Sequence, residues 1–173
     1  MHLETLTMKN LLHNPTKNHK QFLFEVQLSW LEEQKGILQA TDVNEIMHVA
    51  TPKQFGGTGE DWSPEHLFLG AVNSCYMSTL FSFAKKMNLN ILAFECNSIG
   101  QIEMLDGKYR FTFINMYPTI GIAKEEDRVK ANLAVEKTQQ YCLVSNSLSS
   151  EIIYHTEIVI KPYSVCEVND GVL

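Results

Sequence analysis

Four cysteines are the residues of this sequence whose side chains are strong nucleophiles: Cys75, Cys96, Cys142 and Cys166. They are 21, 46 and 24 positions apart, and none stands in a CxxC pair. Because zinc sites use closely spaced cysteines and histidines, we expect no metal, and we expect no organic cofactor. The N-terminal residues lack the apolar segment of a secretory signal, so a framework of structural disulfides is not expected either. Core packing and thiol redox chemistry remain open for each cysteine.

Cys75 stands in the middle of the apolar stretch SPEHLFLGAVNSCYMSTLFSFAKKMNL, residues 63–89, which predicts one long helix. Ser63 is the expected N-cap, Pro64 the first helical residue, and Glu65 a favourable acid in the first turn. Cys75 lies about three turns into the helix, too far from its N-terminus for the helix dipole to activate the thiol. The residues alone therefore predict a buried helix with an unreactive cysteine.

This predicted helix is apolar on nearly every side, and one domain of this size can hardly bury both of its faces. We therefore expect a partner subunit. A stripe of small residues on one face allows either close approach of another helix or ligand, or tight packing within the chain: Ala71, Cys75, Ser78 and Ser82. Glu65 precedes Cys75 by ten residues, about 15 Å along a helix axis, and does not share its face. Cooperation between Glu65 and Cys75 would need a bridging residue or a second chain.

The remaining segments predict strands and one further helix, which together give an α+β domain. Residues 20–33 alternate as a strand with a buried face that carries Phe22, Phe24, Val26 and Leu28. Residues 36–52 supply one or two short strands, and residues 90–122 a hairpin turned at Asp106–Gly107. Residues 124–142 form the second helix, with Val129, Leu133 and Val135 facing inward. Residues 151–162 form a last strand.

Composition excludes several classes of protein. The net charge of the 173-residue chain is −6, and only Arg110 and Arg128 are arginines, so no basic patch for nucleic acid is expected. No apolar run approaches the ~20 residues of a membrane span, so we expect no membrane partner. A cytoplasmic location is expected.

Two motifs together resemble the OsmC/Ohr family of osmotically inducible and organic hydroperoxide resistance proteins. The first is SPEHLFLGAVNSC, residues 63–75, with a Pro-Glu-x-Leu helix start and a cysteine ten residues after the glutamate. The second is YCLVSNSL, residues 141–148, with Cys142 67 positions after Cys75. The resemblance covers about residues 20–162. It implies an N-terminal extension over residues 1–20, a single domain over residues 21–162 and a tail over residues 163–173.

The resemblance implies an OsmC-like fold, with antiparallel sheets wrapped around two central helices in an intertwined homodimer. A three-stranded sheet would come from each end of the chain. It also implies a thiol peroxidase that reduces organic hydroperoxides. Cys75 would become a sulfenic acid, Cys142 would form a disulfide with it, and Glu65 would belong to the same site. An external dithiol would be the reductant.

This sequence departs from the family pattern in two places. Peroxidases of the family pair an N-terminal arginine with the glutamate, but no arginine precedes Arg110, and Lys35 is a weak candidate to replace it. The proline that usually follows the second cysteine is Leu143. Two alternatives therefore stay open: a non-catalytic protein that binds a small hydrophobic or thiol ligand in the dimer pocket, and a purely structural dimer.

Other residues near the motifs have ordinary structural interpretations. Cys96 is expected to pack in the core and Cys166 to lie in the tail. His66 follows Glu65 and is expected to be a surface side chain. Trp62 and Tyr76 flank the candidate site. Each is equally expected to line that site or to pack in the core.

Overall fold

The structure is a computed structural model and describes residues 20–161. Cys166, the predicted tail and residues 1–19 of the predicted extension lie outside the described residues. The described chain divides into two compact units, residues 20–48 and residues 49–161. The predicted single domain over residues 21–162 stays a prediction.

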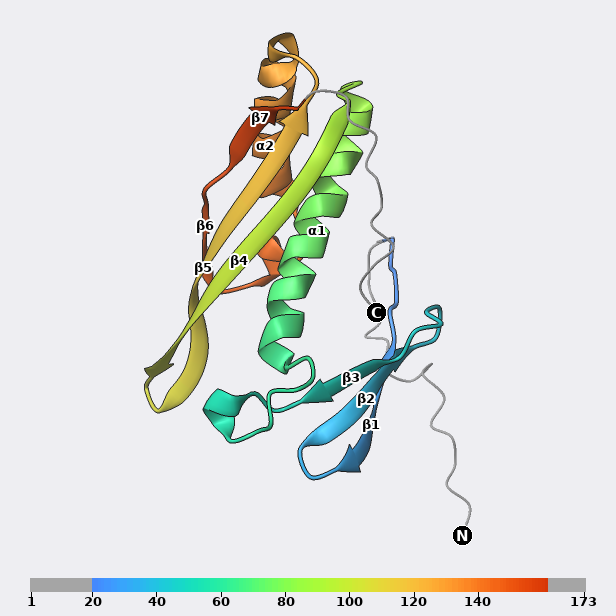
Figure 1. Ribbon diagram of the computed structural model, residues 1–173, viewed down its shortest axis with the longest axis vertical. Coiled ribbons are helices and arrows are strands. Elements are labelled where there is room, and N and C mark those ends of the chain that lie inside the picture. Colours follow the sequence, from blue (N-terminus) through green and yellow to red (C-terminus); the bar gives the residue numbers. More distant parts are fainter. Residues whose placement is uncertain (1–19, 162–173) are drawn as a thin grey trace. The chain divides into compact units, whose positions relative to one another are not determined.

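The first unit contributes strands to a three-stranded sheet with the order β1-β2-β3 (Figure 1). The strands are β1 (Val26–Glu32), β2 (Lys35–Ala40) and β3 (Met47–Ala50), and β1 and β2 are antiparallel. The prediction of a buried face for residues 20–33 is wrong for the single chain. The strand begins only at Val26, and the side chains of Phe22, Phe24, Val26 and Leu28 are all exposed. A lone three-stranded sheet has no second layer of its own against which to bury this face.

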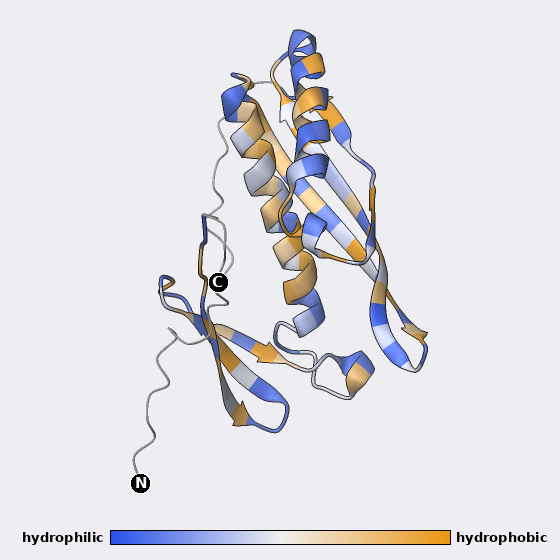
Figure 2. Ribbon diagram, turned by 180° about the vertical axis from the view of Figure 1, so that it is seen from behind, coloured by the Kyte–Doolittle hydropathy of each residue, from blue (hydrophilic) through white to orange (hydrophobic). Residues whose placement is uncertain are grey.

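The second unit places both α-helices on one face of a four-stranded sheet (Figures 1 and 2). α1 (Pro64–Lys86) is followed by β4 (Ile91–Leu105), β5 (Lys108–Ile122), α2 (Arg128–Tyr141), β6 (Glu151–Tyr154) and β7 (Glu157–Ile160). Short 3₁₀ turns are η2 (Lys53–Phe55), η3 (Glu125–Asp127) and η4 (Ser145–Ser147). The predicted hairpin is confirmed. Asp106 and Gly107 both adopt the left-handed conformation that a two-residue turn requires.

The second sheet differs from the prediction in two ways. It is mixed, because β6 and β7 both pair with β5 in parallel, and it has four strands. The single last strand predicted over residues 151–162 is in fact two. The N–H of His155 donates to the carbonyl of Met116 at 2.8 Å, and the next donor in a parallel ladder would be the N–H of residue 118. That residue is Pro118, which has no N–H, so the ladder breaks and resumes at Glu157.

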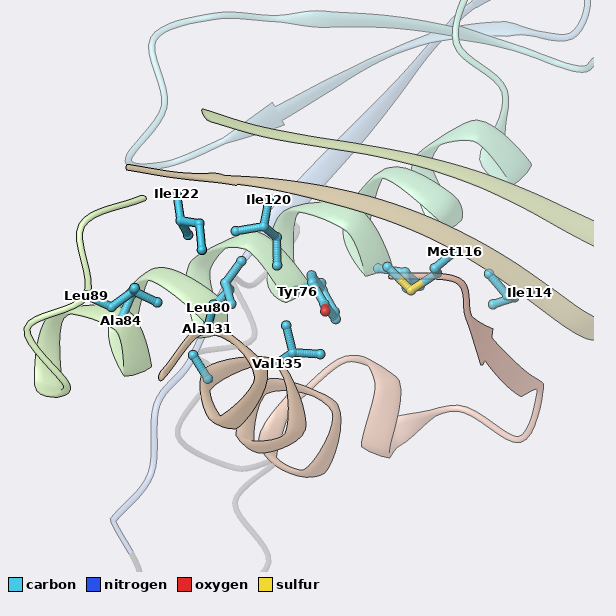
Figure 3. Close-up of a cluster of buried hydrophobic side chains, with 12 residues drawn as sticks. Tyr76, Leu80, Ala84, Leu89, Ile114, Met116, Ile120, Ile122, Ala131 and Val135 are labelled. Atoms are coloured by element: carbon cyan, nitrogen blue, oxygen red, sulfur yellow. The ribbon is translucent and has the colours of Figure 1, made fainter. Parts of the chain in front are cut away.

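The hydrophobic core lies between the sheet and the two helices (Figure 3). α1 contributes Val72, Tyr76, Leu80 and Ala84, and β5 contributes alternate residues from Ile114 to Ile122. α2 buries Val135 as predicted, but Val129 is 78% exposed and Leu133 44% exposed. The predicted inward face of α2 is therefore wrong. The helix instead turns Ala131, Ala134 and Thr138 inward, and these small side chains let it pack closely against α1.

α1 buries only one face in the described chain, as expected from its composition. On the small-residue stripe, Ala71, Ser78 and Ser82 are exposed, so the alternative that the stripe packs within the chain is wrong for them. Among the described helices, α1 alone is long and apolar enough to cross a membrane, with a mean hydropathy of 1.3 over 18 residues. The expectation that no run approaches a span is thereby corrected. Length and composition are weak evidence, because the core helix of a soluble protein passes the same test.

Candidate active site

The site forms where the middle of α1 meets the turn that follows α2. Cys142 is the C-cap of α2, and its N–H donates to the carbonyl of Thr138 at 2.9 Å. The chain then turns sharply, because the N–H of Asn146 returns to the carbonyl of Cys142 at 3.0 Å. The backbone N–H of Val144, inside this turn, donates to Cys75 Sγ at 3.4 Å. The turn thus holds a backbone donor against the sulfur.

Cys75 is half-buried and receives several hydrogen bonds. Burial raises the pKa of its thiol, but hydrogen bonds from the Val144 N–H, the Cys142 thiol, the Leu143 N–H and the Thr79 hydroxyl together outweigh it. The net pKa of Cys75 lies below its ordinary value. A thiolate is the reactive form of cysteine, so this environment favours a nucleophile. The prediction from the residues alone, an unreactive thiol, took no account of these donors.

Cys142 is the opposite case. Its side chain is 0% exposed, and burial raises the pKa of its thiol. Hydrogen bonds from Ser145 oppose the rise, while the hydrogen bond to Cys75 and the charge of Cys75 add to it. Its place at the carbonyl end of α2 also disfavours a negative charge. The pair therefore consists of one thiol poised to ionise and one held protonated, in hydrogen-bond contact.

Glu65 does not meet Cys75 in this chain, as the helix geometry predicted. It lies in the first turn of α1 and lines a cavity of about 380 Å³ together with His66, Leu69 and Phe111. Further lining residues are Pro52, Gln54, Phe55, Ser63, Gly100, Ile102 and Tyr109. Glu65 Oε2 is buried and has no hydrogen-bond partner among the described residues. A β-carbon at Gly100 would lie 2.6 Å from the Phe111 ring. Glycine at this position therefore leaves room for the Phe111 ring to line the cavity.

The neighbouring residues are placed as follows. His66 is exposed and completes a capping box with Ser63, accepting from the Ser63 N–H at 3.3 Å while its own N–H donates to Ser63 Oγ. Tyr76 is fully buried between the rings of Phe94 and Tyr154, so its core alternative holds. Trp62 is exposed.

Two further residues lie apart from the cysteine pair. Cys96 is half-buried against the core and Asn73, as predicted, and burial raises the pKa of its thiol. Lys35 is the first residue of β2, in the other unit. Its role as a substitute for arginine stays a prediction.

Sequence reasoning missed the groups that act on Cys75 other than Cys142. Thr79 lies four residues after Cys75, one turn along the same helix face, and this spacing was a readable signal. The Val144 and Leu143 amides gave no signal, because every residue except proline carries an N–H. Ser145 belongs to the second motif, but nothing in its sequence context indicated contact with a thiol.

Comparison with known proteins agrees with this architecture. The family model described as OsmC-like protein matches residues 57–157. The chain belongs to the OsmC-like protein family. Cys75, Cys142 and Glu65 all fall within the matched residues.

Individual relatives of this OsmC-like protein are distant. Uncharacterized protein YmaD of Bacillus subtilis (strain 168) is 22% identical over 141 residues, which cover 80% of this chain and 94% of that protein. The OsmC-like protein from Mycoplasma pneumoniae has a TM-score of 0.67 at 15% identity, covering 82% of this chain and 99% of its own. A Legionella pneumophila structure, described as an organic hydroperoxide resistance protein, has a TM-score of 0.64 at 17% identity, with 81% and 98% coverage. These likenesses show the fold.

Proposed function

We propose that this OsmC-like protein is a cysteine-based thiol peroxidase that reduces organic hydroperoxides. The observation that carries the proposal is the set of donors around Cys75, which favours its thiolate beside a buried, protonated Cys142. The Legionella pneumophila neighbour, described as an organic hydroperoxide resistance protein, supports the same class of activity.

The reaction has two oxidative steps. The Cys75 thiolate attacks the distal oxygen of R–O–OH, the O–O bond breaks, and with one proton the products are Cys75–SOH and R–OH. The Cys142 sulfur then attacks the Cys75 sulfur, and the hydroxide leaves with the Cys142 proton as water. The product is a Cys75–Cys142 disulfide. An external dithiol returns the protein to its starting state.

A homodimer is part of the proposal. Ala71, Ser78 and Met77 form an exposed strip along α1, in a helix too apolar to be left in water along its length. A second copy on this strip would be able to bring its own Cys75 toward Glu65, which this chain cannot do alone. The cavity beside Glu65 would then supply apolar walls for the organic part of the hydroperoxide.

The test uses intact mass and free-thiol counts before and after one equivalent of cumene hydroperoxide. We expect the loss of two thiols, mapped by digestion to Cys75 and Cys142. Cys75→Ser should abolish peroxide consumption, and Cys142→Ser should stop the cycle at a sulfenic acid that dimedone traps. Cys96→Ser is the matched control and should behave like the parent. Peroxide consumption by Cys75→Ser at the parent rate would refute the proposal.

The second candidate is a non-catalytic binding protein, and one observation favours it. Within residues 20–161 neither arginine forms an ion pair with Glu65: Arg128 is held by Glu125 and by the carbonyl of Ile158 at 2.9 Å, and Glu65 Oε2 has no hydrogen-bond partner. The groups that lower the pKa of Cys75 against burial are the neutral donors from Val144, Cys142, Leu143 and Thr79. In the same experiment this candidate predicts unchanged mass and four free thiols after the peroxide.

A further inference from the structure

A buried polar group beside Cys142 has no part in the oxidative steps above. Ser145 Oγ is buried and has no partner in good hydrogen-bond geometry among the described residues. Its hydroxyl nevertheless acts on two neighbours, the Cys142 thiol and the Tyr154 hydroxyl, and lowers the pKa of each against the larger raising effect of burial. A buried hydroxyl without a well-formed hydrogen bond lowers the stability of the folded protein. Its presence therefore calls for an explanation, such as a role in the reaction.

Unequal exposure of the two sulfurs decides how the disulfide is reduced. Cys75 is half-buried, whereas Cys142 is fully buried under the turn that follows α2. An incoming thiolate therefore reaches the Cys75 sulfur, and Cys142 is the group that must leave. The rate of thiol–disulfide exchange depends on the leaving sulfur, and a sulfur of high pKa leaves slowly as a thiolate. Release of Cys142 thus calls for a proton donor.

We propose that Ser145 donates this proton and that Tyr154 positions and resupplies it, an inference that rests on the proposed function. A thiolate of the external dithiol attacks Cys75 Sγ, forming a mixed disulfide and breaking the Cys75–Cys142 bond. Cys142 takes the electron pair and the Ser145 hydroxyl proton, Ser145 regains a proton from the Tyr154 hydroxyl, and Tyr154 regains one from solvent. The second thiolate of the dithiol then resolves the mixed disulfide and releases Cys75 as a thiolate.

Tyr154 is suited to the outer end of this path. Its side chain is only partly buried, unlike those of Cys142 and Tyr76. The Tyr154 ring packs against Tyr76 with 5.7 Å between centroids, and this contact restricts how the ring can move. The proposed path therefore runs from the fully buried Cys142 sulfur to a side chain that is partly exposed.

The experiment measures the reductive half-reaction alone. The disulfide form of the whole protein is prepared with diamide, and dithiothreitol reduction is followed by quenched thiol counts. We expect reduction to slow by about tenfold or more in Ser145→Ala and in Tyr154→Phe. Ser147→Ala, in the same turn, and Tyr117→Phe, on the outer face of β5, are matched controls and should reduce at the parent rate. Parent-like rates in both test variants would overturn the inference.

Two readouts separate this role from a structural one. The parent should show a normal solvent deuterium isotope effect on reduction at a fixed dithiothreitol thiolate concentration, and Ser145→Ala should lose it. The reduced parent should also react with one equivalent of cumene hydroperoxide, because the oxidative steps do not use this proton path. Failure of the parent to react with the peroxide would refute the proposed function, whereas a retained isotope effect in Ser145→Ala would refute this inference.

Discussion

The Val144 backbone N–H and the Cys75 sulfur lie 3.4 Å apart, joined by a hydrogen bond across 69 positions of the chain. Leu143, the preceding residue, directs its own N–H at the same sulfur. The family pattern has proline at position 143, and proline has no N–H to offer. The departure from the pattern therefore adds a donor to Cys75 in a sequence that lacks the N-terminal arginine.

Leu143→Pro tests this added donor. Proline should raise the pKa of Cys75 and slow its alkylation by iodoacetamide at pH 7 by about tenfold, because a hydrogen bond to a charged group contributes roughly 1.5–3 kcal/mol. The substitution fits the backbone, since Cys142 is already extended (ψ 116°) and the Leu143 side chain is 73% exposed. Leu143→Ala keeps the N–H and is the control. Equal alkylation rates in the two variants would show that this amide does not matter.

Met77→Lys tests the proposed homodimer. Met77 is 41% exposed on the outer face of α1, and a lysine there would place a charge in the proposed interface. We expect a shift from dimer to monomer in sedimentation velocity at micromolar protein. Leu133→Lys, at a residue 44% exposed on α2, makes the same change away from that face and should leave the mass unchanged. A parent protein that sediments as a monomer would contradict the proposal directly.

The capping box at the start of α1 should contribute measurably to stability. Ser63 is buried and accepts the His66 N–H, so Ser63→Ala should lower the free energy of unfolding by about 1 kcal/mol in urea titrations. His66→Ala should cost less, since the imidazole is exposed and water can take its place at the Ser63 N–H and hydroxyl. The double variant should lose less than the sum of the two single losses. Additive losses would mean that the two side chains do not act as one cap.

The buried phenol of Tyr76 should lower the free energy of unfolding at high pH. Burial raises the pKa of its phenol to about 12, against an ordinary value near 10. Between these values the unfolded chain releases the proton while the folded chain keeps it, so the free energy of unfolding falls as pH rises from 10 to 12. The loss should be about 2–3 kcal/mol by pH 12. Tyr76→Phe should flatten this decline relative to the parent, and an equally steep decline in that variant would contradict the prediction.

The sequence predicted the ends and turns of elements well where a single residue type determines the backbone conformation. Ser63 and Pro64 mark the start of α1, and Asp106–Gly107 marks the hairpin turn. The buried face of α2 was mispredicted because Ala131 and Ala134 are buried for their small size, whereas Val129 is more hydrophobic and exposed. The spacing of hydrophobic residues predicts which side of a helix faces the core. It does not predict how closely two helices pack, and close packing favours small side chains at the contact.

The cysteine pair shows the same limit in the candidate site. Residue types and the family resemblance pointed to Cys75 and Cys142, and the structure places their thiols in hydrogen-bond contact. Burial raises the pKa of Cys75, and two of the groups that lower it are backbone amides whose direction depends on how the turn at 142–146 packs onto α1. Such a tertiary contact leaves no mark on the residue types themselves.

The long reach of the Val144 contact gives this thiol a second use, as a reporter of folding. During synthesis Cys75 emerges 67 residues before Cys142, and until the turn after α2 has packed it lacks the donors from Cys142, Leu143 and Val144. We therefore expect the reactivity of Cys75 to rise only when the last elements of the unit are in place. A nascent or misfolded chain should react more slowly at Cys75, and a thiolate-selective probe should label folded molecules preferentially.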